Sequence, residues 1–348
     1  MKRLFFVLLI LGILLRLFYG FGVPDNAFTD NLHHLKNTRA IMQAPGKLLE
    51  LPGPTFPLYY ALNAIALTIF GLSWPGTRVF PFLLQLAQLI LSFLLFKQFS
   101  RDRLAIGAGM AFVLFHPMLI RYGGLNYTGT LTSVFLLATA LFLTKNKNKE
   151  SLTFACLACL TKLSGFLALP GLLLTDFKKN IKHAWILLLP LIYLFFTRSP
   201  DTLTRFFKQI MRILSPAWFL FYKPEYLLLL PWTFWGLPHF KWPLLNMAGV
   251  VSWFVLAPIL LVVVFGFFEL KKRNARFYWF LLISSAFFVL ACLHTYGDAR
   301  YMIPLIPLLG VPLVLGCEKR PPWASMVFFV VYSIVLTLGT LILYWSGY

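Results

Sequence analysis

Long apolar stretches alternate with short clusters of lysine and arginine along the whole sequence. The first stretch, residues 4–21, follows Lys2 and Arg3, and the last covers residues 323–344. An α-helix needs about 20 predominantly apolar residues to cross the hydrocarbon core of a bilayer, and several of these stretches have that length. The pattern therefore predicts an all-α protein, a polytopic bundle of transmembrane helices.

Five basic clusters after the N-terminus set the order of the spans. Short cytoplasmic loops of membrane proteins are enriched in Lys and Arg, so we place every cluster on the cytoplasmic side together with the N-terminus. The clusters are Lys97/Arg101/Arg103, Lys145/Lys147/Lys149, Lys178/Lys179/Lys182, Lys271/Lys272/Arg273/Arg276 and Lys319/Arg320. This placement predicts about 11 spans (range 9–13), near residues 4–22, 79–96, 104–120, 128–144, 151–163, 164–176, 184–197, 246–269, 277–293, 302–316 and 323–344. The short spans 151–163 and 164–176 could form one broken hairpin.

Two long outer segments remain, residues 23–78 and 198–245. Within the first, the apolar run 56–70 cannot cross the membrane without turning the cluster at Lys97 outward, so we predict a juxtamembrane helix there. Within the second, residues 203–214 alternate basic and apolar residues at helical spacing. That pattern fits either an amphipathic helix on a membrane surface or a solvated loop.

The composition supports a membrane protein and excludes an ordinary soluble one. The 348 residues are 59% hydrophobic and 12% charged, whereas soluble domains carry roughly 25% charged residues. The net charge of +20 does not indicate nucleic-acid binding, because the basic residues lie in short clusters between apolar stretches. Cys156, Cys159, Cys292 and Cys317 lie in or beside apolar stretches, as small buried residues do. No repeat or linker divides residues 1–348, so we expect a single membrane domain without a soluble C-terminal domain.

Acidic and basic groups near the outer ends of the spans are the candidates for chemistry, because charge is costly at membrane depth. A predicted helix over 29–43 places Asp30, His33, His34 and Asn37 on one side. An acid favoured by the helix dipole is the alternative explanation for Asp30. Adjacent histidines point in different directions on a helix, so the pattern does not support a metal site, and we expect no cofactor.

Three of the basic residues outside the cytoplasmic clusters are candidates for binding an anion. Lys162 stands between two half-length apolar runs, Arg121 follows the third span, and Arg300 with Tyr301 follows the ninth. Such cations either extend to water or bind an anion. A snorkelling Lys162 and a surface pair of Arg300 with Asp298 remain open as alternatives.

The order of several short motifs carries a family resemblance. The chain has Arg16 in its first span, followed by Phe28-Thr29-Asp30-Asn31-Leu32-His33-His34, Gly53-Pro54-Thr55-Phe56-Pro57-Leu58-Tyr59-Tyr60, Arg78, His116-Pro117, Arg121-Tyr122, Leu160-Thr161-Lys162-Leu163-Ser164-Gly165 and Arg300-Tyr301-Met302-Ile303-Pro304. In order and spacing these motifs resemble the GT-C superfamily of integral-membrane glycosyltransferases. The resemblance is greatest to the branch of the protein O-mannosyltransferases and the lipid A aminoarabinose transferase.

The resemblance implies transfer of a sugar from a polyprenyl-phosphate-linked donor to an acceptor hydroxyl at the outer face of the cell membrane. It implies Asp30 as the catalytic base; in the family a Glu follows this Asp and a Tyr comes three residues later, where this chain has Asn31 and His34. Inversion at the sugar carbon fits this chemistry, in which a phosphate leaving group needs fixed cations but no general acid. The candidate phosphate-binding residues are Lys162, Arg300 and Arg121, and the possible substrate-binding residues are His33, His34, Tyr59 and Tyr301.

Other functions remain open at this point. A transporter or flippase for lipids or small solutes would favour charges along a path at mid-membrane depth, whereas the unusual charges here gather at one boundary. An oligosaccharide transferase acting on asparagine usually carries a large soluble domain. The acceptor is left open between lipid, glycan and protein.

Overall fold

The computed structural model describes the backbone of residues 2–24, 29–51, 56–175, 177–196, 204, 243–294 and 299–345. Within these ranges it does not describe the side chains of residues 2–5, 29–30, 194–195, 243–254, 256, 292–294, 299–300 and 343–345. The segment 203–214 and nearly all of the outer loop 198–245 therefore lie outside the described residues, as does Asp298.

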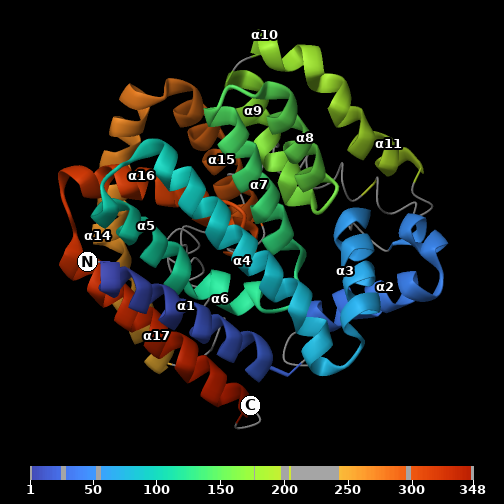
Figure 1. Ribbon diagram of the computed structural model, residues 1–348, viewed down its shortest axis with the longest axis horizontal. Helices are drawn as coiled ribbons and strands as arrows, with labels where there is room; N and C mark the ends of the chain where they lie inside the picture. The colour runs from blue at the N-terminus through green and yellow to red at the C-terminus, as the bar shows by residue number, and fades with distance from the viewer. Residues whose placement is uncertain are drawn as a thin grey trace.

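The regular elements in the described residues are helices, as the apolar pattern predicted (Figure 1). In chain order they are α1 (Lys2–Gly22), α2 (Thr29–Gln43), η2 (Pro45–Glu50), α3 (Pro57–Phe70), α4 (Trp74–Phe99), α5 (Arg103–Phe115), α6 (Pro117–Gly123), α7 (Thr128–Thr144), α8 (Asn148–Cys159), η3 (Leu163–Ala168), α9 (Leu169–Thr175), α10 (Phe177–Asn180), η4 (Ile181–Leu187), α11 (Leu188–Phe196), α14 (Pro243–Arg273), α15 (Ala275–His294), η6 (Ala299–Met302), α16 (Ile306–Lys319) and α17 (Trp323–Trp345). The predicted helix 29–43 is confirmed as α2.

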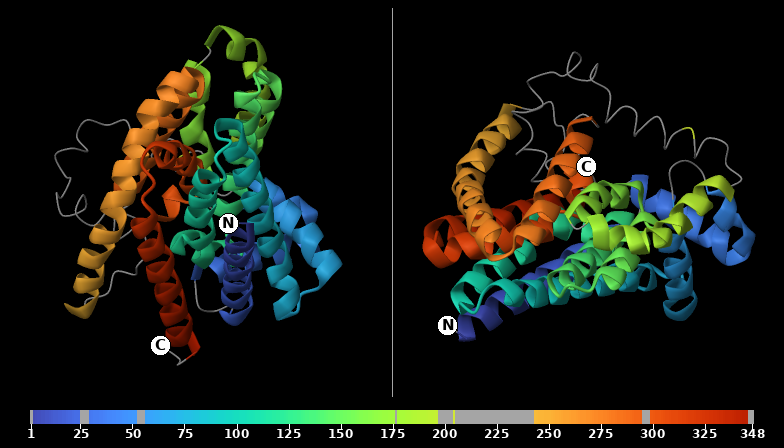
Figure 2. Two further views of the ribbon diagram at one scale, coloured as in Figure 1. Left: turned by 60° about the vertical axis from the view of Figure 1, so that its left-hand side comes forward. Right: turned by 90° about the horizontal axis from the view of Figure 1, so that it is seen from above.

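The centre of the bundle is formed by α5 and α16, which are buried over most of their length. Helices α4 and α7 pack beside them, while α1 and α17 lie next to each other at the edge of the bundle (Figure 1). Figure 2 shows α14 and α15 as a pair along another side. Helix α14 comes close to α16, since Gly266 lies against the backbone of Pro312 and leaves no room for a side chain. Small residues commonly permit such approach between membrane helices.

The outer helices turn apolar side chains away from the protein. Exposed apolar residues of α17 recur at helical spacing and include Val327, Val331, Val335, Leu338 and Ile342. A continuous exposed apolar stripe fits contact with lipid rather than water. By length and composition, α4 and residues 323–342 of α17 can each cross a membrane. The chain is therefore a multi-pass membrane protein, while the count of eleven spans remains a prediction.

Several predicted spans differ in detail from the helices. The span 104–120 is two helices, because α5 ends at Phe115 and the chain bends by 48° into α6. Pro117 lacks a backbone N–H and disfavours helical geometry at His116, whose backbone is extended. The span 302–316 begins only at Ile306, after η6, and the span 184–197 is a 3₁₀-helix followed by α11.

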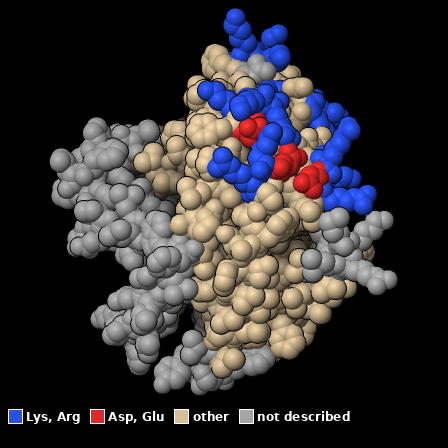
Figure 3. Space-filling model, turned by 90° about the vertical axis from the view of Figure 1, so that its left-hand side faces the viewer, with Lys and Arg blue, Asp and Glu red and all other residues tan. Residues whose placement is uncertain are grey.

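Hydrogen bonds join several of the predicted cytoplasmic clusters at one end of the bundle, which we call the basic end. Arg273 donates to the carbonyl of Phe99 at 2.9 Å and to the carboxylate of Glu318 at 2.5 Å. Arg276 donates to the side chain of Asn148 at the start of α8, at 2.6 Å. Figure 3 shows Lys and Arg side chains gathered at this end, beside a wide uncharged surface. The prediction that all clusters lie on the cytoplasmic side requires them to lie at one end of the bundle, as these do.

Candidate active site

Helix α2 turns a different face toward the bundle from the one predicted. The buried polar residues are Asn31, His34 and Thr38, whereas His33 is exposed and contacts the Asn37 amide at 3.1 Å. The expectation that His33, His34 and Asn37 share one face is therefore wrong, while the side chain of Asp30 lies outside the described residues. The buried face is decided by packing against α3, and it also includes apolar residues such as Leu35.

A buried network of asparagines joins α2 and α3 to the loop before α7. The side-chain oxygen of Asn31 accepts from the backbone N–H and the amide of Asn126, at 2.8 and 3.3 Å. The Asn63 amide donates to Asn126 at 3.2 Å and to Thr38 at 3.1 Å. Asn126 also donates to the carbonyl of Thr77 at the start of α4. Sequence analysis missed Asn126, although an asparagine between Gly124 and an apolar span was a visible signal.

His34 lies among three tyrosines. Its Nδ1 atom is 2.7 Å from the hydroxyl of Tyr60, and its ring contacts Tyr59, Tyr60 and Tyr127 with centroids 5.6–6.0 Å apart. Tyr59 is completely buried and its hydroxyl donates to Asn126 at 3.5 Å. Burial raises the pKa of Tyr59 above its ordinary value of 10, so this phenol stays protonated. The structure thus places Tyr59 in the asparagine network and His34 beside Tyr127.

Lys162 stands at the break between α8 and η3, as its position between two half-length runs predicted. Its backbone is extended, and the carbonyl of Leu160, two residues earlier, accepts from the N–H of Leu58 at the start of α3. Its ammonium donates to the hydroxyl of Tyr127 at 2.5 Å. The same ammonium lies 4.3 Å from the ring centroid of Tyr127 and 5.3 Å from that of Tyr301. Such cation–π contacts hold a charged ammonium in a half-buried place.

Other predicted residues approach this group from different elements. Arg121 lies over the ring of Tyr122, whose centroid is 5.3 Å from that of Tyr127. The backbone of Asp30 lies one helical turn before His34, and the backbone of Arg300 directly precedes Tyr301 in η6. The side chains of Asp30 and Arg300 lie outside the described part of the chain, so their contacts stay predictions.

Two arginines among the sequence motifs have structural partners instead. Arg16 donates to Gln85 and to the carbonyls of Leu119 and Val113, which fixes α1 against three other helices. Arg78 donates to the carbonyl of Gly124 at 3.2 Å and to that of Val23 at 2.8 Å. Both side chains are buried. Arg78 thereby holds the loop that positions Asn126 and Tyr127.

The local chemistry favours an anion. Helix α7 begins at Thr128, directly after Tyr127, and its first N–H groups carry the positive end of the helix dipole. The ammonium of Lys162 lies on that same tyrosine. We call His34, Tyr60, Tyr127, Lys162 and Tyr301 the tyrosine–lysine cluster. Among the described residues, no group of three or more His, Cys, Asp or Glu side chains could hold a metal ion.

No family model and no curated sequence matches this chain. Its fold is similar to that of ArnT from Cupriavidus metallidurans, with a TM-score of 0.59 for the apo structure and 14% sequence identity over 94% of this chain. The structure of ArnT bound to undecaprenyl phosphate gives a TM-score of 0.61 and 13% identity over 92% of this chain. In both comparisons this chain spans 62% of the length of ArnT. This likeness is one of fold, and it confirms the fold that the order of the motifs predicted.

Proposed function

We propose that this protein is a membrane glycosyltransferase that moves a sugar from a polyprenyl-phosphate-linked donor to an acceptor hydroxyl. The observation that carries the proposal is the tyrosine–lysine cluster, in which a half-buried ammonium lies on the side chain of Tyr127, the residue that precedes α7. Further support comes from the fold, which resembles that of a protein crystallised with undecaprenyl phosphate. A phosphate group is an anion that can pair with the ammonium of Lys162 and accept hydrogen bonds from backbone N–H groups at a helix N-terminus.

In the proposed mechanism Asp30 acts as the base. Its carboxylate accepts the proton of the acceptor hydroxyl while that oxygen bonds to the anomeric carbon of the sugar. The bond between this carbon and the phosphate oxygen breaks, and its electron pair leaves with the phosphate. Attack from the side opposite the leaving group inverts the configuration at the anomeric carbon.

Fixed cations stabilise the charge that develops on the departing phosphate. Lys162 and Arg300 are the proposed phosphate-binding residues, with Arg121 behind Tyr122 as a third. His34 and Tyr301 border the same space and are proposed to contact the sugar or the acceptor. The apolar outer surface of the bundle would leave the prenyl chain in the bilayer.

We place the reaction at the outer face of the cell membrane, with the N-terminus and the basic end in the cytoplasm. Cysteine labelling tests this orientation at Ser73, which is exposed before α4, and at Lys145, which is exposed after α7. Lys145 is preferable to the neighbouring Asn146, whose φ of 57° disfavours substitution. In cysteine-free protein, Ser73→Cys should react from outside and Lys145→Cys only after permeabilisation. Reaction of both from the same side would contradict the placement of α3 outside the membrane.

The decisive experiment is transfer from a radiolabelled polyprenyl-phosphate sugar by protein reconstituted in liposomes. We expect label to leave the donor and to enter a lipid, glycan or protein fraction, with release of polyprenyl phosphate. Counting the three fractions separately identifies the acceptor class. A transporter or flippase would move the donor across the bilayer without cleaving it. Movement of intact donor without cleavage, with every acceptor class supplied, would overturn the proposal.

A further inference from the structure

The basic end carries far more positive than negative charge. The ends of α4, α5, α14 and α16 hold eight basic and three acidic residues, and these are Lys97, Arg101, Arg103, Lys271, Lys272, Arg273, Lys319, Arg320, Asp102, Glu269 and Glu318. Figure 3 shows the acidic side chains surrounded by basic ones. A surface of this kind attracts anions.

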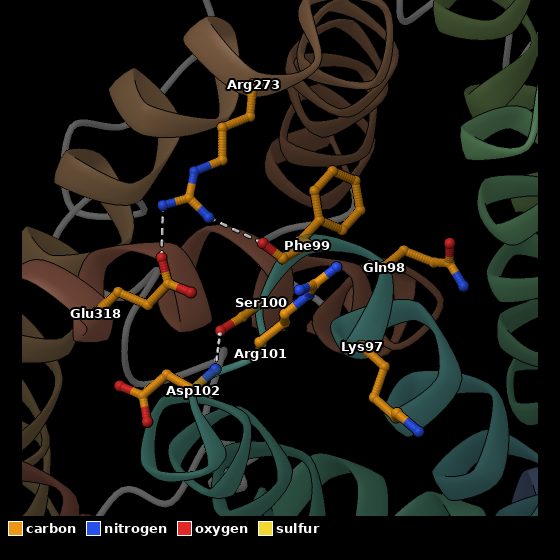
Figure 4. Close-up of a pocket in the computed structure, with 8 residues that line it drawn as sticks. All are labelled: Lys97, Gln98, Phe99, Ser100, Arg101, Asp102, Arg273 and Glu318. Carbon is orange, nitrogen blue, oxygen red and sulfur yellow. Dashed lines mark hydrogen bonds and ion pairs between the residues drawn. The ribbon is translucent and has the colours of Figure 1, made fainter.

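A pocket of about 530 Å³ lies within this surface, between the ends of α4, α14 and α16 (Figure 4). Its acidic groups already have partners in the protein. Glu318 pairs with Arg273, which also bonds the carbonyl of Phe99, and Asp102 accepts the N–H of Leu104 at the start of α5.

Arg101 is the cation that these contacts leave available. Among the described residues its guanidinium makes no hydrogen bond or ion pair, and it lines the same pocket as Arg273 (Figure 4). Lys97 lines the edge of the pocket, with its ammonium 5.5 Å from the ring centroid of Phe93. The planar fork of a guanidinium matches the geometry of a phosphate.

The pocket lies where the apolar surface of the bundle ends. Leu94 and Leu104 are each 41% exposed, and they flank the segment that carries Lys97 and Arg101. Elsewhere at the basic end, Arg320 lies 4.6 Å from the ring centroid of Phe265. Basic side chains that lie along apolar or aromatic surface while their charged tips point to water are typical of the headgroup region of a bilayer.

We propose that this pocket binds the phosphate of an anionic phospholipid headgroup, with Arg101 as its main ligand and the acyl chains against Leu94 and Leu104. The site lies at the opposite end of the bundle from the tyrosine–lysine cluster. Lipid binding at this pocket does not depend on sugar transfer, so this proposal is independent of the proposed function.

The test measures phosphatidylglycerol bound to the full chain in detergent, counted by native mass spectrometry during a lipid titration. Arg101→Ala should weaken binding of the first lipid about tenfold or more, as expected for the loss of a hydrogen-bonded charge. Arg101→Lys keeps the charge without the fork and should lose less. Lys149→Ala is the matched control, because it removes an exposed charge of the basic end outside the pocket. It should change binding less than twofold.

Two further probes identify the ligand. Phosphatidylcholine should bind without dependence on Arg101, because it has no net negative charge. Glycerol 3-phosphate should bind far more weakly than phosphatidylglycerol, because it has no acyl chains. An equal loss in Arg101→Ala and Lys149→Ala would mean diffuse surface attraction and overturn the proposal. Binding of glycerol 3-phosphate as tight as that of the lipid would also overturn it, in favour of a soluble anion.

Discussion

The two ends of the bundle use polar residues in opposite ways. At the basic end, exposed charges meet exposed or half-buried partners, as in the ion pair of Lys272 with Glu269. At the other end, buried uncharged groups such as Asn126 and Tyr59 hydrogen-bond to each other, and the half-buried ammonium of Lys162 donates to the neighbouring Tyr127. The difference shows that the number of charges is a poor guide to chemistry. A half-buried cation that lies against aromatic rings is better evidence for a catalytic site than a large number of exposed charges.

The physical reason is the cost of desolvation. Exposed ion pairs contribute little to stability because water and salt screen them. A buried polar group that loses its partner costs about 1–3 kcal/mol. Substitutions in the asparagine network should therefore lower the free energy of unfolding strongly. Matched substitutions at the basic end should lower it little.

The largest expected effect is that of Asp30→Asn. Loss of a general base should lower the rate of sugar transfer about 10²–10⁴-fold while the protein remains folded and membrane-inserted. The measurement is the initial rate per folded molecule, after purification in detergent. Glu50→Gln is the control, because it neutralises an exposed acid of the same outer segment. A rate within about threefold of wild type for Asp30→Asn would remove the assignment.

Lys162→Ala should come next, with a rate about 10²-fold lower, because a fixed cation at the leaving group is worth a few kcal/mol. Arg300→Ala should behave similarly, and Arg300→Lys should be poorly tolerated if its contact is bidentate. Rates are compared at saturating and limiting donor, with Lys147→Ala at the basic end as the control. If Lys162 only snorkels, turnover per folded molecule will match wild type.

Asn126→Ala tests the asparagine network itself. It leaves the Asn63 amide and the Tyr59 hydroxyl without this acceptor, while Asn31 keeps only its bond to the backbone N–H of residue 126. The free energy of unfolding should therefore fall by about 2–4 kcal/mol. Asn148→Ala, which removes a partner of Arg276 at the basic end, should cost about 1 kcal/mol or less. Thermal and denaturant unfolding in detergent measures both. An equal loss of unfolding free energy in the two variants would contradict the proposed difference between the two ends.

Tyr127→Phe should have the smallest effect of the four. It keeps the ring that lies under the Lys162 ammonium but removes the hydroxyl that accepts from it, at a cost of about 1 kcal/mol or about fivefold. If Tyr127 positions Lys162 for the donor phosphate, the loss should appear mainly in KM for the donor. A matching Tyr122→Phe substitution, which leaves Lys162 untouched, should not change KM. Equal behaviour of the two variants would assign Tyr127 a purely structural role.

The sequence predicted those features that depend on local chemistry. Apolar length predicted the helices, and the short runs around Lys162 predicted the break between α8 and η3. The basic clusters predicted which turns lie together, because positive charge is confined to one side of a membrane. The order of the motifs predicted a fold that the similarity to ArnT bears out.

The tertiary structure alone decided which polar groups meet. The sequence could not show that Asn31, rather than His33, faces the bundle, because both choices give a plausible helix. It could not reveal Asn126 as the partner of Asn31, Asn63 and Tyr59, or place Tyr127 between His34 and Lys162. These partners are 35 to 95 positions apart along the chain. Helix periodicity reports only neighbours within a turn or two, whereas buried hydrogen bonds form wherever packing brings their partners together.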